Sequence, residues 1–209
     1  MEIKLAVFDF DSTLMDGETL ELLTTDDVLR IKLKSITEQA MAGKLDFFES
    51  LTQRVSHLKG IPLSHVNNIF NSLPYMPGAK ELISELKKHD IITICFSGGF
   101  DGAVQIAQKE LGFDTYFANF LHEKNGILTG EVGGDMMCSN SKGIMLQKLQ
   151  KILNIPPEKT MVVGDGANDS SMFKFAQTRV AFCAKEVLKK EATVIIENKN
   201  LLEILDYIK

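Results

Sequence analysis

The sequence predicts an α/β protein with a parallel sheet flanked by helices, and two observations carry this prediction. Several short runs are rich in β-branched and apolar residues, and their apolarity is near-continuous rather than alternating. Such runs are typical of strands that are buried on both faces. Helical periodicity fills the segments between them, and strands that alternate with helices favour a parallel sheet. The five predicted strands are residues 3–8, 91–96, 160–163, 179–182 and 193–196.

Three helices are predicted between these strands, because apolar side chains recur there at the helical period of 3.6 residues. The first follows Pro77-Gly78, the second ends at Gly112, and the third runs to Leu153. These helices would cover the two faces of the sheet.

The connection between the first two predicted strands is longer than a sheet crossover requires. A simple strand–helix–strand unit takes roughly 30 residues, and the surplus here shows further helical patterns. We therefore expect a catalytic core of residues 1–13 and 76–209, with a small helical cap domain of residues 14–75 inserted after the first strand. The cap would lie over the edge where open α/β sheets bind ligands. Its predicted helices are residues 28–41, 47–58 and 66–73.

A second, smaller insertion is predicted at residues 120–131. Asn125-Gly126 lies there between two strand-like stretches, and this dipeptide is the strongest short signal for a β-hairpin. We expect a β-hairpin flap.

Composition limits the classes of partner and the compartment. The chain has 209 residues, 44% of them hydrophobic and 24% charged, as in ordinary globular proteins. A net charge of −5 argues against nucleic-acid and membrane partners, which attract basic patches. The apolar N-terminal run is too short for a signal peptide or a membrane span. Cys95, Cys138 and Cys183 form no C-x-x-C pair, so we expect buried, reduced thiols and a cytoplasmic location.

The first candidate functional residues are Asp9 and Asp11, directly after the first predicted strand. Two carboxylates that lie close together repel, and one becomes protonated unless a cation lies between them. Mg²⁺, a hard ion that prefers oxygen ligands, would satisfy such a pair. From these two residues alone, a capped turn beside a solvated carboxylate explains the pattern equally well.

The strand at 160–163 adds two further carboxylates, Asp165 and Asp169, within a segment that reads Gly-Asp-Gly-Ala-Asn-Asp from residue 164. The carboxyl ends of parallel strands face one crevice, so these groups should approach the first pair. A cluster of carboxylates without a metal would be strongly destabilising, which favours a metal site. The segment lacks the third glycine of a dinucleotide-binding loop.

Two further features would complete a phosphate site at the same edge. Ser97 and Gly98 follow the second strand, and a hydroxyl and main-chain amides at a strand-to-helix turn can bind a phosphate oxygen. Lys142 lies near the start of a predicted helix, where a cation is unfavourable with respect to the helix dipole. Turn chemistry and a solvated lysine explain each feature in isolation, and only the combination favours phosphate binding.

Together these residues have the parts needed to hydrolyse a phosphate monoester. Such esters react extremely slowly without a catalyst, so charge neutralisation, in-line positioning and leaving-group protonation are all required. Asp9 would attack phosphorus and form an aspartyl-phosphate. Asp11 would protonate the departing alkoxide and then activate water. Ser97, Lys142 and main-chain amides would neutralise the phosphoryl oxygens together with Mg²⁺.

These segments resemble the four motifs of the haloacid dehalogenase superfamily: Asp9-x-Asp11-x-Thr13, Ser97, Lys142 and residues 164–169, in that order. The resemblance covers essentially the whole chain and implies a Rossmann-like sheet with an inserted cap. The flanks of the motifs resemble more narrowly the members of that family that hydrolyse O-phosphoserine. That resemblance implies Mg²⁺-dependent release of serine and phosphate, the last step of serine biosynthesis.

The resemblance also assigns roles within the core. Asp9 would be the nucleophile and Asp11 the acid/base. Mg²⁺ would be held by Asp9, Asp165 and the main-chain carbonyl of Asp11, with support from Asn168 and Asp169. The predicted residues that bind the phosphate end of the substrate are Ser97, Gly98, Lys142 and Asn168.

In the cap, Glu18 and Arg54 match the residues that recognise the amino and carboxylate groups of phosphoserine. Arg54 shares the apolar face of the predicted helix 47–58. An arginine there is either an anion receptor under a lid or a side chain that extends to solvent past apolar neighbours. Glu18 has a solvated carboxylate as its alternative. Met41 and Phe47 would close the site against water.

Three other functions share part of this pattern. A related phosphatase for another small phosphate monoester would keep the core and differ at Glu18 and Arg54. A dehalogenase needs neither Mg²⁺ nor an acid at Asp11. A signalling receiver domain, which only accepts a phosphoryl group, is much shorter and lacks a cap. The expected partner is therefore a small phosphate monoester, and the expected assembly is a monomer or homodimer.

Overall fold

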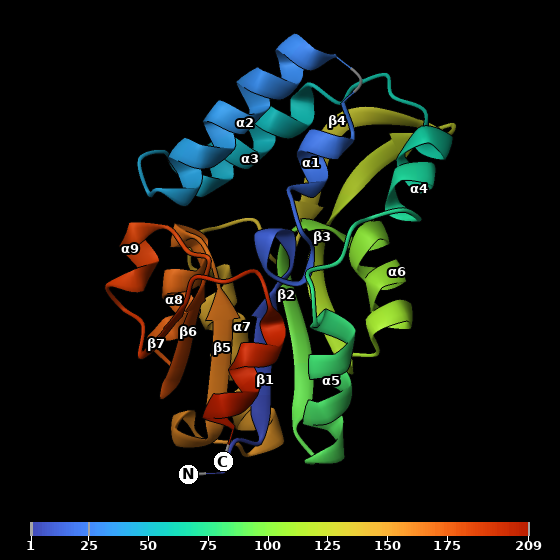
Figure 1. The fold of residues 1–209 in the computed structure, drawn as a ribbon. Helices are drawn as coiled ribbons and strands as arrows, with labels where there is room; N and C mark the ends of the chain where they lie inside the picture. The colour runs from blue at the N-terminus through green and yellow to red at the C-terminus, as the bar shows by residue number, and fades with distance from the viewer. Residues whose placement is uncertain (1, 25, 209) are drawn as a thin grey trace.

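The computed structural model describes residues 2–24 and 26–208. Within them, seven strands form one sheet in the order β4-β3-β2-β1-β5-β6-β7. Figure 1 shows helices on both faces of this sheet and further helices beyond one of its edges. The strands are β1 (Leu5–Asp9), β2 (Ile92–Phe100), β3 (Thr115–Lys124), β4 (Ile127–Gly134), β5 (Thr160–Gly164), β6 (Thr178–Phe182) and β7 (Val194–Ile196).

The central strand is β1, which pairs in parallel with β2 and with β5. Its residues are buried throughout, as the near-continuous apolar pattern predicted. The pairs β2–β3, β5–β6 and β6–β7 are also parallel. The carboxyl ends of these strands therefore meet at one edge, and the predicted parallel α/β sheet is confirmed.

Two apolar cores lie on the two faces of the sheet, because alternate residues of β1 point in opposite directions. Phe8 packs with α5 (Ala79–Lys88) and α6 (Asp101–Leu111). Val7 packs with α7 (Ser141–Leu153) and its neighbours on the other face. The remaining helices and helical turns of this part are α8 (Ser170–Phe173), α9 (Glu186–Lys189), η1 (Phe10–Leu14), η2 (Pro157–Lys159), η3 (Ala167–Asp169) and η4 (Leu201–Tyr207).

Of the α-helices that the described residues form between β1 and β2, α5 packs on a face of the sheet, and the other four lie beyond its carboxyl edge (Figure 1). Side chains of Asp26 and Asp46 cap α2 and α3 by accepting hydrogen bonds from main-chain amides in the first turns. The first helix of the group is too short to give a periodic signal, and the sequence did not predict it. The four are α1 (Thr19–Leu22), α2 (Asp27–Met41), α3 (Phe47–Ser56) and α4 (Leu63–Phe70).

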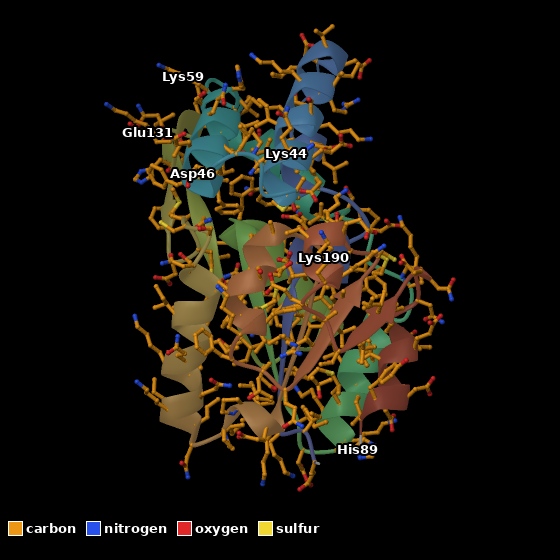
Figure 2. All side chains as sticks on the ribbon, turned by 90° about the vertical axis from the view of Figure 1, so that its left-hand side faces the viewer. Lys44, Asp46, Lys59, His89, Glu131 and Lys190 are labelled. Atoms are coloured by element: carbon orange, nitrogen blue, oxygen red, sulfur yellow. The ribbon has the colours of Figure 1, made fainter. Side chains whose placement is uncertain are left out.

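The two connections between these helices and the sheet run side by side. Met15 and Tyr75 form an antiparallel bridge, and the amide of Met76 donates to the carbonyl of Leu14 at 2.9 Å. In Figure 2 the loop that carries Lys44 and Asp46 lies above the sheet, whereas His89 lies at the opposite end of the molecule.

The predicted hairpin is present, with its turn at Asn125-Gly126, but it is not an isolated flap. Its first strand begins five residues earlier than expected and pairs in parallel with β2, so the hairpin extends the main sheet. The far end of the hairpin also joins the cap helices. The amide of Gly60 donates to Leu128 at 3.0 Å, and the amide of Leu63 donates to Gly126 at 2.8 Å.

The cysteines only partly follow the prediction. Cys95 is buried and Cys183 is half-buried, but Cys138 is exposed because it lies in the loop that leads into α7 rather than on a strand. Among the described helices, none combines the length and apolarity needed to cross a membrane.

Candidate active site

The site is built first from the turn that follows β1. Asp9 ends the strand and is 4% exposed, and its Oδ1 accepts a hydrogen bond from the amide of Phe10 at 2.7 Å. The chain then turns through η1, where Ser12 adopts a left-handed conformation with φ of 58°. Only a few per cent of non-glycine residues adopt such a conformation, and they occur often at functional sites. The turn leaves Asp9 and Asp11 facing one pocket.

Three buried carboxylates and one lysine meet below this pocket. Asp9, Asp165 and Asp169 each place a carboxylate oxygen within 4.8 Å of the others. The Nζ atom of Lys142 lies 2.6 Å from Oδ1 of Asp9 and 2.6 Å from Oδ1 of Asp169. A single lysine cannot balance three carboxylates, so the cluster carries excess negative charge that a cation would offset.

The pKa values of the cluster reflect this imbalance. Burial, and then the neighbouring Asp169, raise the pKa of Asp9 to about 8 against the opposing effect of Lys142. Burial and Asp9 raise the pKa of Asp165 well above its usual range. Burial alone would lower the pKa of Lys142, but Asp169 and Asp9 together raise it. Each carboxyl would ionise readily only beside a further positive charge, which is the behaviour expected of metal ligands.

Both carboxylate oxygens of Asp169 already accept hydrogen bonds, so this residue orients its neighbours and is a poor metal ligand. One of its oxygens binds Lys142, and Oδ2 accepts the amides of Asp165 and Gly166 at 3.0 and 3.1 Å. A methyl group at Gly164 would lie 2.3 Å from Oδ2, so glycine is required for this approach. Asp9 and Asp165 are therefore the better candidates for a metal.

Asp11 is held by Thr19 at the start of α1. Both the amide of Thr19, at 2.8 Å, and its hydroxyl donate to Oδ1 of Asp11. Burial raises the pKa of Asp11, and these two hydrogen bonds oppose the rise. The other oxygen faces the carboxyl end of β2, because a methyl group on Gly99 would lie 2.7 Å from Oδ2. Oδ2 is thus the oxygen available to a substrate.

The last residues of β2 present a hydroxyl and amides toward the same place; the strand runs on to Phe100, past the end predicted at residue 96. Ser97 is fully buried, and its Oγ accepts the amide of Gly99 at 2.9 Å. Asn119 fixes the next residue by donating to the carbonyl of Gly98 at 3.0 Å. A methyl group on Gly98 would lie 2.7 Å from the ring of Phe47, so the absence of a side chain lets the cap close onto this end of the strand.

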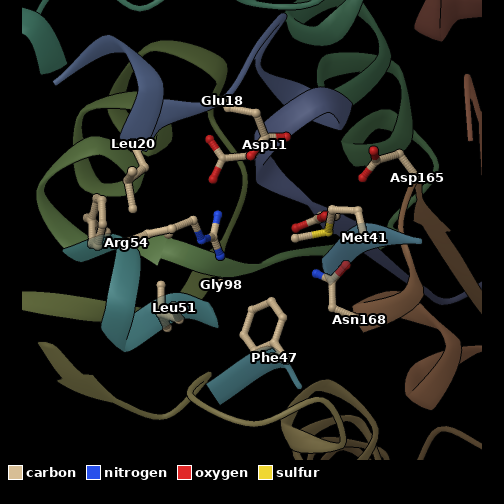
Figure 3. A pocket seen from close by; sticks show the side chains of 13 residues that line it. Asp11, Glu18, Leu20, Met41, Phe47, Leu51, Arg54, Gly98, Asp165 and Asn168 are labelled. Atoms are coloured by element: carbon tan, nitrogen blue, oxygen red, sulfur yellow. The ribbon is translucent and has the colours of Figure 1, made fainter. Parts of the chain in front are cut away.

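Residues of the cap and of the core line one narrow pocket of about 30 Å³. Figure 3 shows Phe47 at the pocket and Met41 between Asp165 and Asn168. The Oδ1 atom of Asn168 is buried without a hydrogen-bond partner among the described residues, so it is free to contact a ligand. A ligand in this pocket would therefore contact the core and the cap at once.

Two charged side chains of opposite sign lie under the cap. Arg54 is 4% exposed, and its Nε and Nη1 donate to the carbonyl of Ser50 at 3.2 Å and to Oγ1 of Thr37 at 2.8 Å. Its guanidinium points toward the carboxylates of Asp11 and Glu18 (Figure 3). Glu18 accepts a hydrogen bond from the hydroxyl of Ser12 at 2.9 Å. Burial, and then Asp11, raise the pKa of Glu18 to about 8.

Replacing Glu18 with glutamine should weaken the pH dependence of stability. A carboxyl whose pKa rises on folding favours the folded state at low pH, and this contribution is lost as pH rises from about 4.5 toward 8. We expect the thermal midpoint of the wild type, measured with a chelator and without substrate, to fall over that range more than the midpoint of Glu18→Gln. Glu158→Gln, at an exposed glutamate, is the matched control, and parallel curves for all three proteins would contradict the assignment.

The structure brings most of the predicted site residues to one pocket. Ser97 and Lys142 are buried behind its lining. Sequence reasoning missed Thr19 and Thr37, which hold Asp11 and Arg54. Neither has a motif, and only the fold places them beside charged groups. The predicted residues that line the pocket are Asp9, Asp11, Glu18, Met41, Phe47, Arg54, Gly98, Asp165 and Asn168.

Comparison with known proteins agrees with this geometry. A family model described as haloacid dehalogenase-like hydrolase matches residues 3–177. A phosphoserine phosphatase from Wolinella succinogenes is 56% identical over 206 residues, which are 99% of this chain and 100% of that protein. A phosphoserine phosphatase from Methanocaldococcus jannaschii is 47% identical, over 99% of this chain and 98% of that protein.

Solved structures give the same result. A structure described as a phospho-aspartyl intermediate analogue of phosphoserine phosphatase has a TM-score of 0.96 and 46% identity, over the full length of both chains. A substrate-bound phosphoserine phosphatase complex also has a TM-score of 0.96, with 45% identity and full coverage of both chains. The chain therefore belongs to the haloacid dehalogenase-like hydrolase family. The two relatives from Wolinella succinogenes and Methanocaldococcus jannaschii, matched over nearly their full length, are phosphoserine phosphatases.

Proposed function

We propose that this chain is a phosphoserine phosphatase, which hydrolyses O-phosphoserine to serine and phosphate. The observation that carries the proposal is that one pocket has a phosphate-binding end and an amino-acid-binding end. At one end, Asp9 and Asp11 lie beside the carboxyl end of β2, which carries Ser97, and at the other, Arg54 and Glu18 face the pocket from the cap side. A phosphorylated amino acid has a phosphate for the first end and charged amino and carboxylate groups for the second. Two relatives matched over nearly their full length are named phosphoserine phosphatases.

In the proposed mechanism, Asp9 is the nucleophile. Its carboxylate attacks phosphorus, the bond to the serine oxygen breaks, and an aspartyl-phosphate forms. Asp11 transfers a proton from Oδ2 to the departing alkoxide and later takes a proton from the attacking water. The two donors from Thr19 hold Oδ1, so the carboxyl keeps one orientation in both steps. Lys142 counters the negative charge of Asp9 in the resting state.

We propose Mg²⁺ as the metal, held by Asp9, Asp165 and the main-chain carbonyl of Asp11, with Asn168 and Asp169 in support. The buried carboxylates, with their excess negative charge, fit a hard divalent cation that prefers oxygen ligands. When bound, Mg²⁺ would neutralise charge on the phosphoryl oxygens and on the Asp9 carboxylate, which attacks phosphorus. Asp169 supports the site by binding the amides of Asp165 and Gly166.

Phosphate recognition is proposed for Ser97, Gly98, Lys142 and Asn168, and recognition of the serine end for Glu18 and Arg54. Met41 and Phe47 exclude water once the pocket is closed. We propose that residues 14–75 form a cap domain on a core of residues 1–13 and 76–209. A cytoplasmic location and a monomeric or homodimeric state stay predictions.

A phosphate-release panel tests the function directly. We expect rapid release from O-phosphoserine, slower release from phosphothreonine, little from nucleoside monophosphates, and loss of release when a chelator removes divalent cations. If Mg²⁺ restores phosphate release and Ca²⁺ does not, this would support Mg²⁺, the smaller ion, as the metal. Preference for a sugar phosphate or a nucleotide would instead favour the related phosphatase with another substrate.

Arg54→Ala tests the substrate assignment separately from the chemistry. Removing a buried guanidinium that grips a carboxylate should lower kcat/KM for phosphoserine by roughly 100-fold. The activity on phosphoethanolamine, which has no carboxylate, should change little. Arg30→Ala, at an exposed arginine that pairs with Asp27 on α2, is the matched control. Unchanged phosphoserine hydrolysis in Arg54→Ala would overturn the substrate assignment and leave the phosphatase assignment standing.

A further inference from the structure

The starting observation is that Arg54 is buried as a cation without an ion pair in the described part of the chain. A buried charge is costly unless hydrogen bonds or an opposite charge compensate it. Two protein acceptors bind the guanidinium, the carbonyl of Ser50 and the hydroxyl of Thr37. Nη2 makes no hydrogen bond to the described residues, so this nitrogen is available to a ligand.

The two acceptors differ in how they can move. Ser50 lies one turn before Arg54 on α3 and therefore moves with it. Thr37 lies on α2, seventeen residues away in sequence, and its side chain is 4% exposed. The orientation of the guanidinium relative to its own helix is thus set by one local contact and one contact from a separate helix.

The neighbouring elements hold α3 and α2 in different ways. The segment that follows α3 is fastened to the hairpin, where Gly60 donates to Leu128 and Leu128 donates to Ile61 at 2.9 Å. By contrast, α2 borders a second cavity of about 210 Å³ that extends down to Asp165 and Lys185 of the core. One side of α2 therefore packs against α3 and another borders open space, whereas the end of α3 is joined to the hairpin by main-chain hydrogen bonds.

Thr37 also shares a helix face with the residue that closes the pocket. Met41 lies four residues later, one turn along α2, and both residues border the second cavity. When α2 is docked, Met41 lies over the pocket and Thr37 reaches Arg54. Any displacement of α2 from α3 would break both contacts together.

We propose that Thr37 is a positioning residue for substrate specificity: its hydroxyl holds the Arg54 guanidinium in the orientation that receives the substrate carboxylate, and it does so only when α2 is docked. This inference rests on the proposed function. It makes recognition of the amino-acid end depend on closure of the pocket. The grip on the carboxylate is complete only in the state that excludes water.

Thr37→Val tests the proposal, because valine keeps the branched shape and removes the hydroxyl. We expect kcat/KM for phosphoserine to fall roughly tenfold, mainly through a higher KM. We expect kcat/KM for phosphoethanolamine to stay within about twofold of the wild type, since that ester has no carboxylate for Arg54. Thr37→Ser, which restores a hydroxyl, should recover the preference for phosphoserine.

The ratio of the two kcat/KM values is the deciding quantity, because it does not depend on the fraction of enzyme that is folded. Thr52→Val is the control, since among the described residues the Thr52 hydroxyl bonds only carbonyls of its own helix. Its ratio should equal that of the wild type. An unchanged ratio in Thr37→Val, whether both activities hold or both fall, would overturn the proposal. A wild type that does not prefer phosphoserine over phosphoethanolamine would instead refute the proposed function.

Discussion

Asp9→Asn is expected to abolish phosphate release and leave the fold intact. The amide is nearly isosteric with the carboxylate but is not a nucleophile toward phosphorus, so no aspartyl-phosphate can form. Loss of an attacking group typically lowers kcat by roughly 10⁴-fold or more. Phosphate release under saturating phosphoserine and Mg²⁺ measures this loss.

The same substitution should stabilise the protein when no divalent cation is present. Folding raises the pKa of Asp9 to about 8, so its ionised form opposes folding increasingly as pH rises through that value. Asparagine carries no charge, and its Oδ1 can still accept a hydrogen bond from Lys142. We therefore expect the thermal midpoint of Asp9→Asn in chelator at pH 8 to equal or exceed that of the wild type. With Mg²⁺ present the order should reverse, because the wild type gains more from binding.

Asp16→Asn is the matched control, at a nearby aspartate that pairs with Lys199 on the surface. It should change neither phosphate release nor the response to Mg²⁺. Appreciable turnover by Asp9→Asn would remove Asp9 from the nucleophile role. A lower midpoint in chelator would show that the carboxylate stabilises the cluster even without a metal.

The sequence predicted the sheet and the convergence of the core residues on one edge, because both depend on short-range patterns. The strands buried on two faces have continuous apolar runs, and Asp9, Ser97 and Asp165 follow three of these runs directly. Once the strands are parallel, their carboxyl ends share an edge. That these residues lie close together can then be predicted without knowing the conformation of the loops.

The features that the sequence did not predict depend on tertiary contacts. The start of β3 was missed because this strand is only partly buried and lacks a continuous apolar run. The contact between Thr37 and Arg54 was missed because a threonine within a helix is an ordinary residue until another helix packs against it. The excess of buried negative charge could be anticipated from the four aspartates, but the bridging position of Lys142 required the structure.

Lys142→Met is expected to impair both stability and catalysis, because Lys142 touches two buried carboxylates. Breaking a buried charge pair by removing one partner typically costs about 3–5 kcal/mol of unfolding free energy. Loss of a group that stabilises transition-state charge typically lowers kcat by roughly 10³-fold. Urea unfolding and steady-state phosphate release measure the two effects. Lys148→Met, at an exposed lysine on the same helix, should change neither.

The pH dependence distinguishes lost charge compensation from lost packing. Without Lys142, the pKa of Asp9 should rise further, so its carboxyl is neutral at low pH and opposes folding only as pH increases. The gap in unfolding free energy between the wild type and Lys142→Met should therefore be small near pH 4 and widen toward pH 8. A gap that stays constant over this range would point to packing alone. Adding Asp169→Asn to Lys142→Met should recover part of the stability without recovering turnover, since one uncompensated carboxylate is removed while the cation that faces Asp9 is still missing.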